Sequence, residues 1–433
     1  MMVRMAREET RTTSRTTRNP TAAGGSGSAA PLTRAWATRL VVVGIVLSAV
    51  NLRPAITSLG ALLEEVRDDL GMSGSVAGLL TSVPPLCFAV FGVTAPRLAR
   101  RFGPPAVVCA GMVAIAAGLL IRPYAGSTGG FLAASALALM GIAVSNVLMP
   151  VIVKRWFPDR VGSMTGLYSM ALAAGTSAAA AATVPLTGML GGWQSGLAAW
   201  AALAAVAVLP WLPLVRDRGQ APAEREPARQ AGQERQEPAL RITRSRTAWA
   251  LAVFFGLQAT AAYITMGWMA QIFRDAGVAA GTAGLLLAVT MVMGVPLAFV
   301  IPRLAARLPH QGPIVLALGA CGLAGYAGLY FAPAGGAWAW ALLLGISNCA
   351  FPLALTMVGM RAGTGAGVAQ LSAFAQSTGY LISIPGPLLV GVLYQNSGGW
   401  GLPLALMAGL MLPQMAVGFL AGRDRTVEDE AAR

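Results

Sequence analysis

The sequence predicts an all-α membrane protein of about twelve transmembrane helices, arranged as two parallel six-helix halves. Of its 433 residues, 56% are hydrophobic and only 11% are charged, whereas a soluble domain usually carries about 25% charged residues. The charges lie in short clusters, and most apolar stretches between them reach the roughly 20 residues that a helix needs to cross the membrane. Length alone would permit two or three soluble domains, but this distribution of charge excludes them.

Six apolar spans are expected on each side of one long polar interruption. They lie near 39–63, 75–96, 105–124, 130–153, 161–183, 193–214, 248–273, 280–302, 312–332, 336–360, 365–391 and 400–421. The domain organisation that follows is a disordered cytoplasmic tail at 1–38, bundles at 39–214 and 248–421, a cytoplasmic linker at 215–247 and a second tail at 422–433.

Three motifs recur at corresponding spans of the two halves. They are AGLL (77–80 and 283–286), PRLARRFG with PRLAARLP (96–103 and 302–309), and SNVLMP with SNCAFP (145–150 and 347–352). An even number of spans in each half makes the repeats parallel. Transporters with such repeats bind substrate near the midplane of the bilayer, between the halves.

The net charge of +14 indicates membrane topology rather than nucleic-acid binding. With the N-terminus inside, nearly all of the 31 Lys and Arg residues fall in cytoplasmic segments. Arg67 and Arg274 fall in external loops, and Arg53 and Arg122 fall within or at the outer edge of spans. This asymmetry is the positive-inside pattern. We therefore expect a multi-pass protein of the cell membrane with both termini in the cytoplasm.

Arg53 is the sharpest functional signal. It is the only charged residue between Arg39 and Glu64 and lies near the middle of the first span, where an arginine costs roughly 2.5–3.5 kcal/mol by insertion scales. All 17 Asp and Glu residues fall in predicted loops or tails, so a bound anion is one candidate counter-ion, held by the paired hydrogen bonds of a guanidinium. The alternative is structural: Pro54 frees the carbonyl of Val50, which Arg53 could cap.

The same distribution of carboxylates bears on ion coupling. Proton-driven pumps commonly use intramembrane Asp, Glu or His residues, and the single histidine, His310, lies in a cytoplasmic loop. The sequence leaves open whether transport is coupled to a proton. Glu64 and Glu65 at the outer mouth of the first span are the nearest carboxylates, although a solvated amphipathic turn explains them better.

Further polar and aromatic residues lie deep in spans and are candidates for a substrate cavity. Gln376 and Tyr380 are four residues apart and share one helix face with Ser372. With Arg53, the predicted substrate-binding residues are Asn51, Asn146, Tyr263, Gln376 and Tyr380. For the Asn and Gln residues, hydrogen bonding between helices is the competing interpretation.

Arg97, Arg100 and Arg101 follow the second span. They are expected to anchor the topology and contact anionic lipid, or to form a cytoplasmic latch that breaks during transport. The phosphate-binding, metalloprotease and nucleophile-elbow motifs are missing from the sequence, and the four cysteines form no CxxC pair. We expect no cofactor, metal site or catalytic residue.

The six-plus-six pattern resembles the major facilitator superfamily. The usual loop after its second span, GxxxDRxGRR, is similar to GVTAPRLARRFG from Gly92, in which Pro96 occupies the aspartate position. More specific stretches resemble the branch of cyanate permeases and 2-nitroimidazole transporters, among them NLRPAITSLGALL (51–63), SNVLMPVIVKRWFP (145–158) and SAFAQSTGYLISIPGPLLVGVLY (372–394). This resemblance implies transport of a small anion or heterocycle, with Arg53 facing substrate and Gln376 and Tyr380 beside it.

The leading hypothesis is a secondary transporter that works by alternating access. Its substrate would be a small anion such as cyanate. A monomer can complete the transport pathway in this architecture. The alternative is an exporter of small heterocycles or drugs, although the fifth span lacks the Gly-Pro-rich pattern of proton-driven drug exporters. The sequence contains no soluble output domain, which argues against a sensor or scaffold. No predicted span carries a nucleophile–base pair, which argues against an enzyme.

Overall fold

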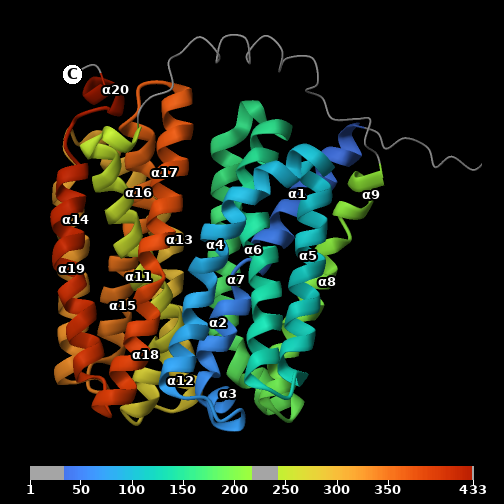
Figure 1. The fold of residues 1–433 in the computed structure, drawn as a ribbon, viewed down its shortest axis with the longest axis vertical. Coiled ribbons are helices and arrows are strands. Elements are labelled where there is room, and N and C mark those ends of the chain that lie inside the picture. Colours follow the sequence, from blue (N-terminus) through green and yellow to red (C-terminus); the bar gives the residue numbers. More distant parts are fainter. Residues whose placement is uncertain (1–33, 217–241, 432–433) are drawn as a thin grey trace, which may run out of the picture.

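The computed structural model describes residues 34–216 and 242–431, and these residues form helices joined by short turns (Figure 1). Most of the expected N-terminal tail and of the linker lies outside the described residues. Eleven of the described helices or helix pairs are long and apolar enough to cross a membrane, and the shorter apolar helix α8 (Trp193–Val208) brings the number to twelve. The predicted all-α fold of about twelve membrane spans is confirmed.

The first half of the chain forms six spans from nine α-helices. Besides α8 they are α1 (Arg34–Asn51), α2 (Pro54–Ala61), α3 (Leu63–Asp69), α4 (Gly74–Phe102), α5 (Pro104–Ile121), α6 (Thr128–Trp156), α7 (Val161–Leu190) and α9 (Trp211–Arg216), with the 3-10 turns η1 (Arg122–Tyr124) and η2 (Pro158–Arg160) between them.

The second half forms six further spans, of which three are split in two. Its elements are η3 (Ile242–Arg244), α11 (Arg246–Asp275), α12 (Ala280–Val292), α13 (Gly294–Arg307), α14 (Gly312–Phe331), α15 (Ala337–Asn348), α16 (Ala350–Met360), α17 (Gly365–Ser383), α18 (Pro385–Ser397), α19 (Gly401–Ala421) and α20 (Val427–Ala431).

The first span is broken between α1 and α2, at the position that carries Arg53. Pro54 is the first residue of α2, and a proline there has no N–H to donate and would clash with the carbonyl four residues earlier, that of Val50. Helix α7 packs closely against this break, since a Cβ added at Gly175 would lie 2.1 Å from the Val50 oxygen. The break therefore sets the Arg53 side chain on a non-helical junction in the middle of a span.

The recurring motifs occupy equivalent helices in the two halves. The PRLA motif lies in α4 and in α13, and the SNxxxP motif lies in α6 and again across α15 and α16. The second copy differs locally, because α15 ends at Asn348 and α16 begins at Ala350, whereas α6 runs unbroken through its own copy.

The two halves lie side by side and approach each other unequally along the molecule (Figure 1). We call the end that carries α9, η3 and α20 the linker end, and the opposite end, which carries α3, the α3 end. In Figure 1 the ribbons of the two halves meet at the α3 end and diverge toward the linker end.

The segment after α19 folds back as the short helix α20, which the description of residues 422–433 as a tail did not anticipate. The Glu428 carboxylate accepts hydrogen bonds from the backbone N–H groups of Gly363 (3.0 Å) and Thr364 (3.2 Å) at the start of α17. The Glu430 carboxylate accepts from the hydroxyls of Ser245 (2.6 Å) and Thr247 (2.7 Å) at the start of α11. A negative charge at a helix N-terminus is favourable, so α20 fastens the starts of α11 and α17 together.

Acidification is expected to release α20. Partial burial raises the pKa of Glu428 and Glu430, but the hydrogen bonds that they accept outweigh it, and the net pKa of each lies below its ordinary value of 4.5. A depressed folded-state pKa means that the contact is at full strength above the unfolded-state pKa and weakens as pH falls through the folded-state value. The protection factors of residues 427–431, which correct the hydrogen-exchange rate for its intrinsic pH dependence, should therefore fall below about pH 4.5. A variant with Glu428→Gln and Glu430→Gln should have low protection factors already at neutral pH, with little further change on acidification.

Candidate functional site

Arg53 lies between α1 and α2 and projects toward side chains of both halves. Its guanidinium is half-buried, and within residues 34–216 and 242–431 it forms no ion pair. Its nearest electrostatic neighbours are the hydroxyls of Tyr263, Tyr380 and Tyr168. Of these, the Tyr263 hydroxyl lies within interaction distance of the Arg53 guanidinium. The structure shows Arg53 among phenols rather than capping the Val50 carbonyl.

Aromatic rings close one side of this site. The Arg53 guanidinium carbon lies 6.0 Å from the centroid of Phe88, within range of a cation–π interaction. Phe88 of α4 stacks on Tyr380 of α17 with centroids 5.0 Å apart and an interplanar angle of 19°. Phe255 of α11 meets the edge of Tyr380 at 5.3 Å. Residues of both halves therefore form one continuous wall beside the positive charge.

Exposure differs among the site residues. Phe88, Tyr263 and Tyr380 are 4%, 3% and 7% exposed. Arg53 and Asn146 keep intermediate exposure. The aromatic part of the site is therefore covered, whereas Arg53 and Asn146 stay partly accessible.

Two of the predicted cavity residues have local hydrogen-bond partners. Asn146 of α6 accepts a hydrogen bond from the Tyr168 hydroxyl of α7. Gln376 donates to the Ser372 hydroxyl at 2.8 Å, one turn earlier in α17, so the predicted polar stripe on this helix is present. Gln376 and Tyr168 are half-buried like Asn146.

Asn51 has a different environment from the other predicted site residues. Its side-chain amide donates to the carbonyls of Leu47 (2.8 Å) and Leu203 (3.2 Å), which ties α1 to α8 inside the first half. It is 1% exposed. Both amide hydrogens are thereby used in helix packing, the alternative that the sequence left open.

The arginines of the predicted latch lie apart from the central site. Arg97, Arg100 and Arg101 are exposed in the last turns of α4 at the linker end. Arg101 stacks over the ring of its neighbour Phe102 at 5.3 Å.

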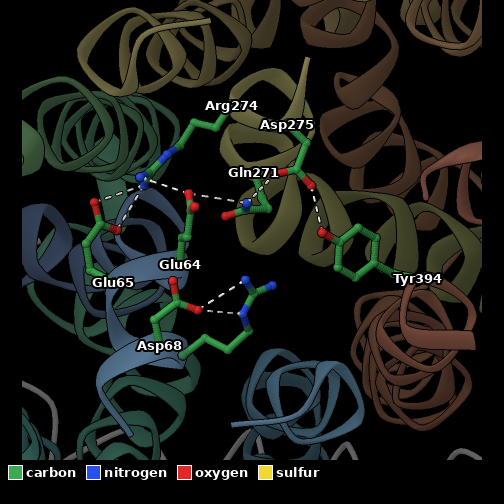
Figure 2. Close-up of polar contacts among 8 residues, drawn as sticks. Glu64, Glu65, Asp68, Gln271, Arg274, Asp275 and Tyr394 are labelled. Carbon is green, nitrogen blue, oxygen red and sulfur yellow. Dashed lines mark hydrogen bonds and ion pairs between the residues drawn. The ribbon is translucent and has the colours of Figure 1, made fainter. Parts of the chain in front are cut away.

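At the α3 end, an ion-pair cluster joins the two halves (Figure 2). Arg274 of α11 pairs with Glu64 at 2.8 Å and with Glu65 at 2.9 Å, both on α3. Gln271 bridges Glu64 (3.4 Å) and Asp275 (2.7 Å). These contacts correct the interpretation of Glu64 and Glu65 as a solvated turn, because both carboxylates are used across the interface between the halves.

Close backbone packing accompanies the ion pairs at this end. A Cβ added at Gly60 of α2 would lie 1.9 Å from the Met266 carbonyl oxygen of α11. One added at Gly391 of α18 would lie 2.3 Å from the Gly74 oxygen of α4, and one at Gly78 would lie 2.9 Å from the Leu388 oxygen. Distances this short leave no room for a side chain, so the halves are in backbone contact here.

The sequence missed several residues of this site. Phe88 lies in an apolar motif with no polar signal of its own, and Tyr168 was not among the predicted site residues. The pairing of Arg274 with Glu64 and Glu65 joins residues some two hundred positions apart, although the isolated external arginine facing two external acids was a usable signal.

The chemistry available at the centre is recognition of negative charge. One guanidinium supplies a full positive charge and a planar set of N–H donors, and three phenol hydroxyls surround it. The described residues contain no cluster of three or more His, Cys, Asp or Glu side chains that could hold a metal ion. The arrangement suits a small anion whose oxygen or nitrogen atoms accept hydrogen bonds.

Comparison with known proteins connects the fold to transport. The chain is 35% identical over 393 residues to an uncharacterized transporter, YycB, of Bacillus subtilis (strain 168), covering 89% of this chain and 94% of that protein. It is 32% identical to the 2-nitroimidazole transporter of Escherichia coli (strain K12), covering 90% and 96% of the two chains. It is 30% identical to the cyanate transport protein CynX of the same organism, covering 85% and 94%.

Solved structures share the fold at low sequence identity. The crystal structure of the nucleoside transporter NupG superposes with a TM-score of 0.69 at 14% identity, over 89% of this chain and 98% of that one. The sequence profile described as Major Facilitator Superfamily matches residues 45–374. This chain belongs to the major facilitator superfamily of membrane transporters.

Proposed function

We propose that this transporter carries a small anion across the cell membrane by alternating access, and that Arg53 binds the anion. The observation that supports this most directly is the Arg53 guanidinium, which lies between the halves and forms no ion pair with any carboxylate of the described residues. A buried charge is costly unless it is paired, and an anionic substrate would supply the missing charge. Similarity to a cyanate transport protein is in accord with this substrate class.

The site is built so that substrate would contact both halves. Arg53, Asn146 and Tyr168 belong to the first half, whereas Tyr263, Gln376 and Tyr380 belong to the second. An anion held by Arg53 gives the phenol hydroxyls of the second half an acceptor, so binding favours closure of the halves around it. Asn51 takes no direct part, because its amide hydrogens already bind backbone carbonyls of the first half.

The distribution of positive charge supports one orientation in the membrane. Under the positive-inside pattern the termini and the linker are cytoplasmic, so the linker end faces the cytoplasm and the α3 end faces outward. The conformation described here is then closed outward by the Arg274 ion pairs and the glycine contacts. Arg97, Arg100 and Arg101 become a candidate latch for the opposite conformation, in which the cytoplasmic side closes.

The alternative cargo is a neutral heterocycle, and the aromatic wall of Phe88, Tyr380 and Phe255 is the feature that favours it. A planar ring could stack there without using the charge of Arg53. The two cargo classes therefore differ in their dependence on the guanidinium.

Thermal unfolding of the detergent-purified chain with a panel of ligands tests the proposal. The panel contains cyanate, nitrate, bicarbonate, formate, acetate and 2-nitroimidazole. A ligand present at 100 times its Kd stabilises the folded state by about 2.7 kcal/mol, which raises the melting temperature measurably. We expect at least one small anion to stabilise the wild type and Arg303→Gln, an exposed control at the linker end, but not Arg53→Gln. Stabilisation by 2-nitroimidazole alone, equal in all three proteins, would reject the anion site and favour the heterocycle.

A further inference from the structure

A second buried arginine lies between the central site and the α3 end. Arg122, in the turn η1 after α5, is 2% exposed. Its guanidinium donates to the Ala55 carbonyl at 2.8 Å and to the Ser58 hydroxyl at 3.3 Å, both on α2, and lies 6.0 Å from the centroid of Phe131. It forms no ion pair within the described residues.

The polar groups beside Arg122 are incompletely satisfied. The Arg122 Nε atom and the Ser135 hydroxyl are buried and have no hydrogen-bond partner within the described protein. Both residues line one cavity, whose wall also contains Tyr263, Thr81 and Gly267. Buried polar atoms without partners are rare in native proteins, and two of them beside one cavity point to a ligand that accepts hydrogen bonds.

The size of the cavity limits what it can hold. Its volume is about 20 Å³, which corresponds to one particle of about the size of a water molecule. Nitrate and carboxylates exceed this size, whereas a halide fits with small side-chain movements. A water molecule could accept one hydrogen bond from Arg122, but it would leave the charge of the buried guanidinium uncompensated.

We propose that the cavity beside Arg122 binds one chloride-sized monovalent anion at a site separate from Arg53. Arg122 and Ser135 belong to the first half, and Tyr263 and Gly267 belong to the second. The anion would therefore contact both halves where they are in backbone contact, and it would stabilise the conformation that is closed at the α3 end. Tyr263 lines this cavity and also lies beside Arg53, on which the Arg122 site does not depend.

Thermal unfolding in chloride against gluconate, at constant ionic strength, tests this proposal with no transport substrate present. We expect chloride and bromide to raise the melting temperature of the wild type by several degrees in a saturable way. Arg122→Gln should lose this increase. Ser135→Ala, which removes a single hydroxyl and keeps a small side chain, should shift the half-saturating chloride concentration upward several-fold. Arg53→Gln should keep the full response.

Three outcomes would overturn the site. The first is equal melting in chloride and gluconate for the wild type. The second is an unchanged halide response in both Arg122→Gln and Ser135→Ala, which would locate the halide elsewhere. The third is loss of the response in Arg53→Gln alone, which would assign the halide to the central site. Arg53→Gln is tested separately from Arg122→Gln. If the Arg122 site is disproved, the proposed transport of an anion at Arg53 is unaffected. If anion binding at Arg53 is disproved, the halide response at Arg122 is still expected.

Discussion

Replacing Gly60 with valine is expected to abolish transport while the protein still inserts and folds. Even a Cβ at this position would lie 1.9 Å from the Met266 oxygen, and neither backbone can move far inside its own helix. The halves can separate at the α3 end instead, because that contact lies between them. A penalty of more than about 3 kcal/mol on the closed state shifts a two-state equilibrium more than 100-fold, so the variant should remain open outward.

Transport in proteoliposomes and labelling of an introduced cysteine measure this effect. Thr81, which is 7% exposed and faces Gly267 across the interface, is replaced by cysteine in a background without the native cysteines. An impermeant thiol reagent added from outside should label Thr81→Cys rapidly in Gly60→Val and slowly without it. Gly188→Val is the matched control, because a Cβ there has no neighbour within 4 Å.

A graded variant separates steric opening from loss of charge pairing. Arg274→Gln removes the pairs with Glu64 and Glu65, which are partly exposed, and exposed pairs contribute about 0–1 kcal/mol each. Arg274→Gln should raise the labelling rate of Thr81→Cys several-fold, which is less than the increase expected in Gly60→Val. If Gly60→Val transports at the wild-type rate and still protects Thr81→Cys from labelling, the contact between Gly60 and Met266 does not close the α3 end.

Arg53→Gln is expected to lower transport at sub-saturating substrate by two orders of magnitude or more. Removing one partner of a buried, hydrogen-bonded charge pair costs about 2–5 kcal/mol, and here the lost partner also carries the planar set of donors. Arg53→Lys keeps the charge but loses that planar geometry, so it should retain roughly a tenth of the activity. Initial rates in proteoliposomes over a range of substrate concentrations distinguish the two variants.

The control for Arg53 is stability in the absence of ligand. Gln fits the space of a half-buried arginine, and Arg53 makes no ion pair in the described part of the chain whose loss would leave another charge alone. Arg53→Gln should therefore melt at the wild-type temperature when no anion is added. Full transport by Arg53→Gln would reject its role in binding, and a large loss of ligand-free stability would make the residue structural.

The spans could be predicted from the sequence because each depends on local composition. Pro54 indicated a freed Val50 carbonyl, but the break of the first span between α1 and α2 was not predicted. The break between α12 and α13 was also not predicted, although Pro296 in the first turn of α13 acts on the Val292 carbonyl as Pro54 acts on that of Val50. Helix α20 was also missed, since Glu428 and Glu430 acquire partners only when the starts of α11 and α17 are brought together.

The residues of the candidate site also divide into those that the local sequence identifies and those that only the fold identifies. Arg53 was identifiable because an isolated charge inside an apolar span is conspicuous in a linear sequence. Arg122 carried the same signal but lies at the end of its span, where arginine ordinarily reaches the interface; only the fold shows that it turns inward to Ala55 and Ser58. Phe88 could not be distinguished from other apolar residues, because its contact with Tyr380 joins different halves.

Arg53 has no carboxylate partner among residues 34–216 and 242–431, and a carrier that works as proposed would be sensitive to voltage when it is empty. Moving one elementary charge through the full membrane potential is worth about 2.3 kcal/mol per 100 mV. With the cell interior negative, the empty carrier is favoured with its positive site exposed to the cytoplasm. Binding of a monovalent anion cancels the charge, so the loaded carrier reorients without electrical work. For a carrier that works as proposed here, the empty return step outward is the one opposed by the field, and exchange of one anion for another should outpace net uptake in energised vesicles.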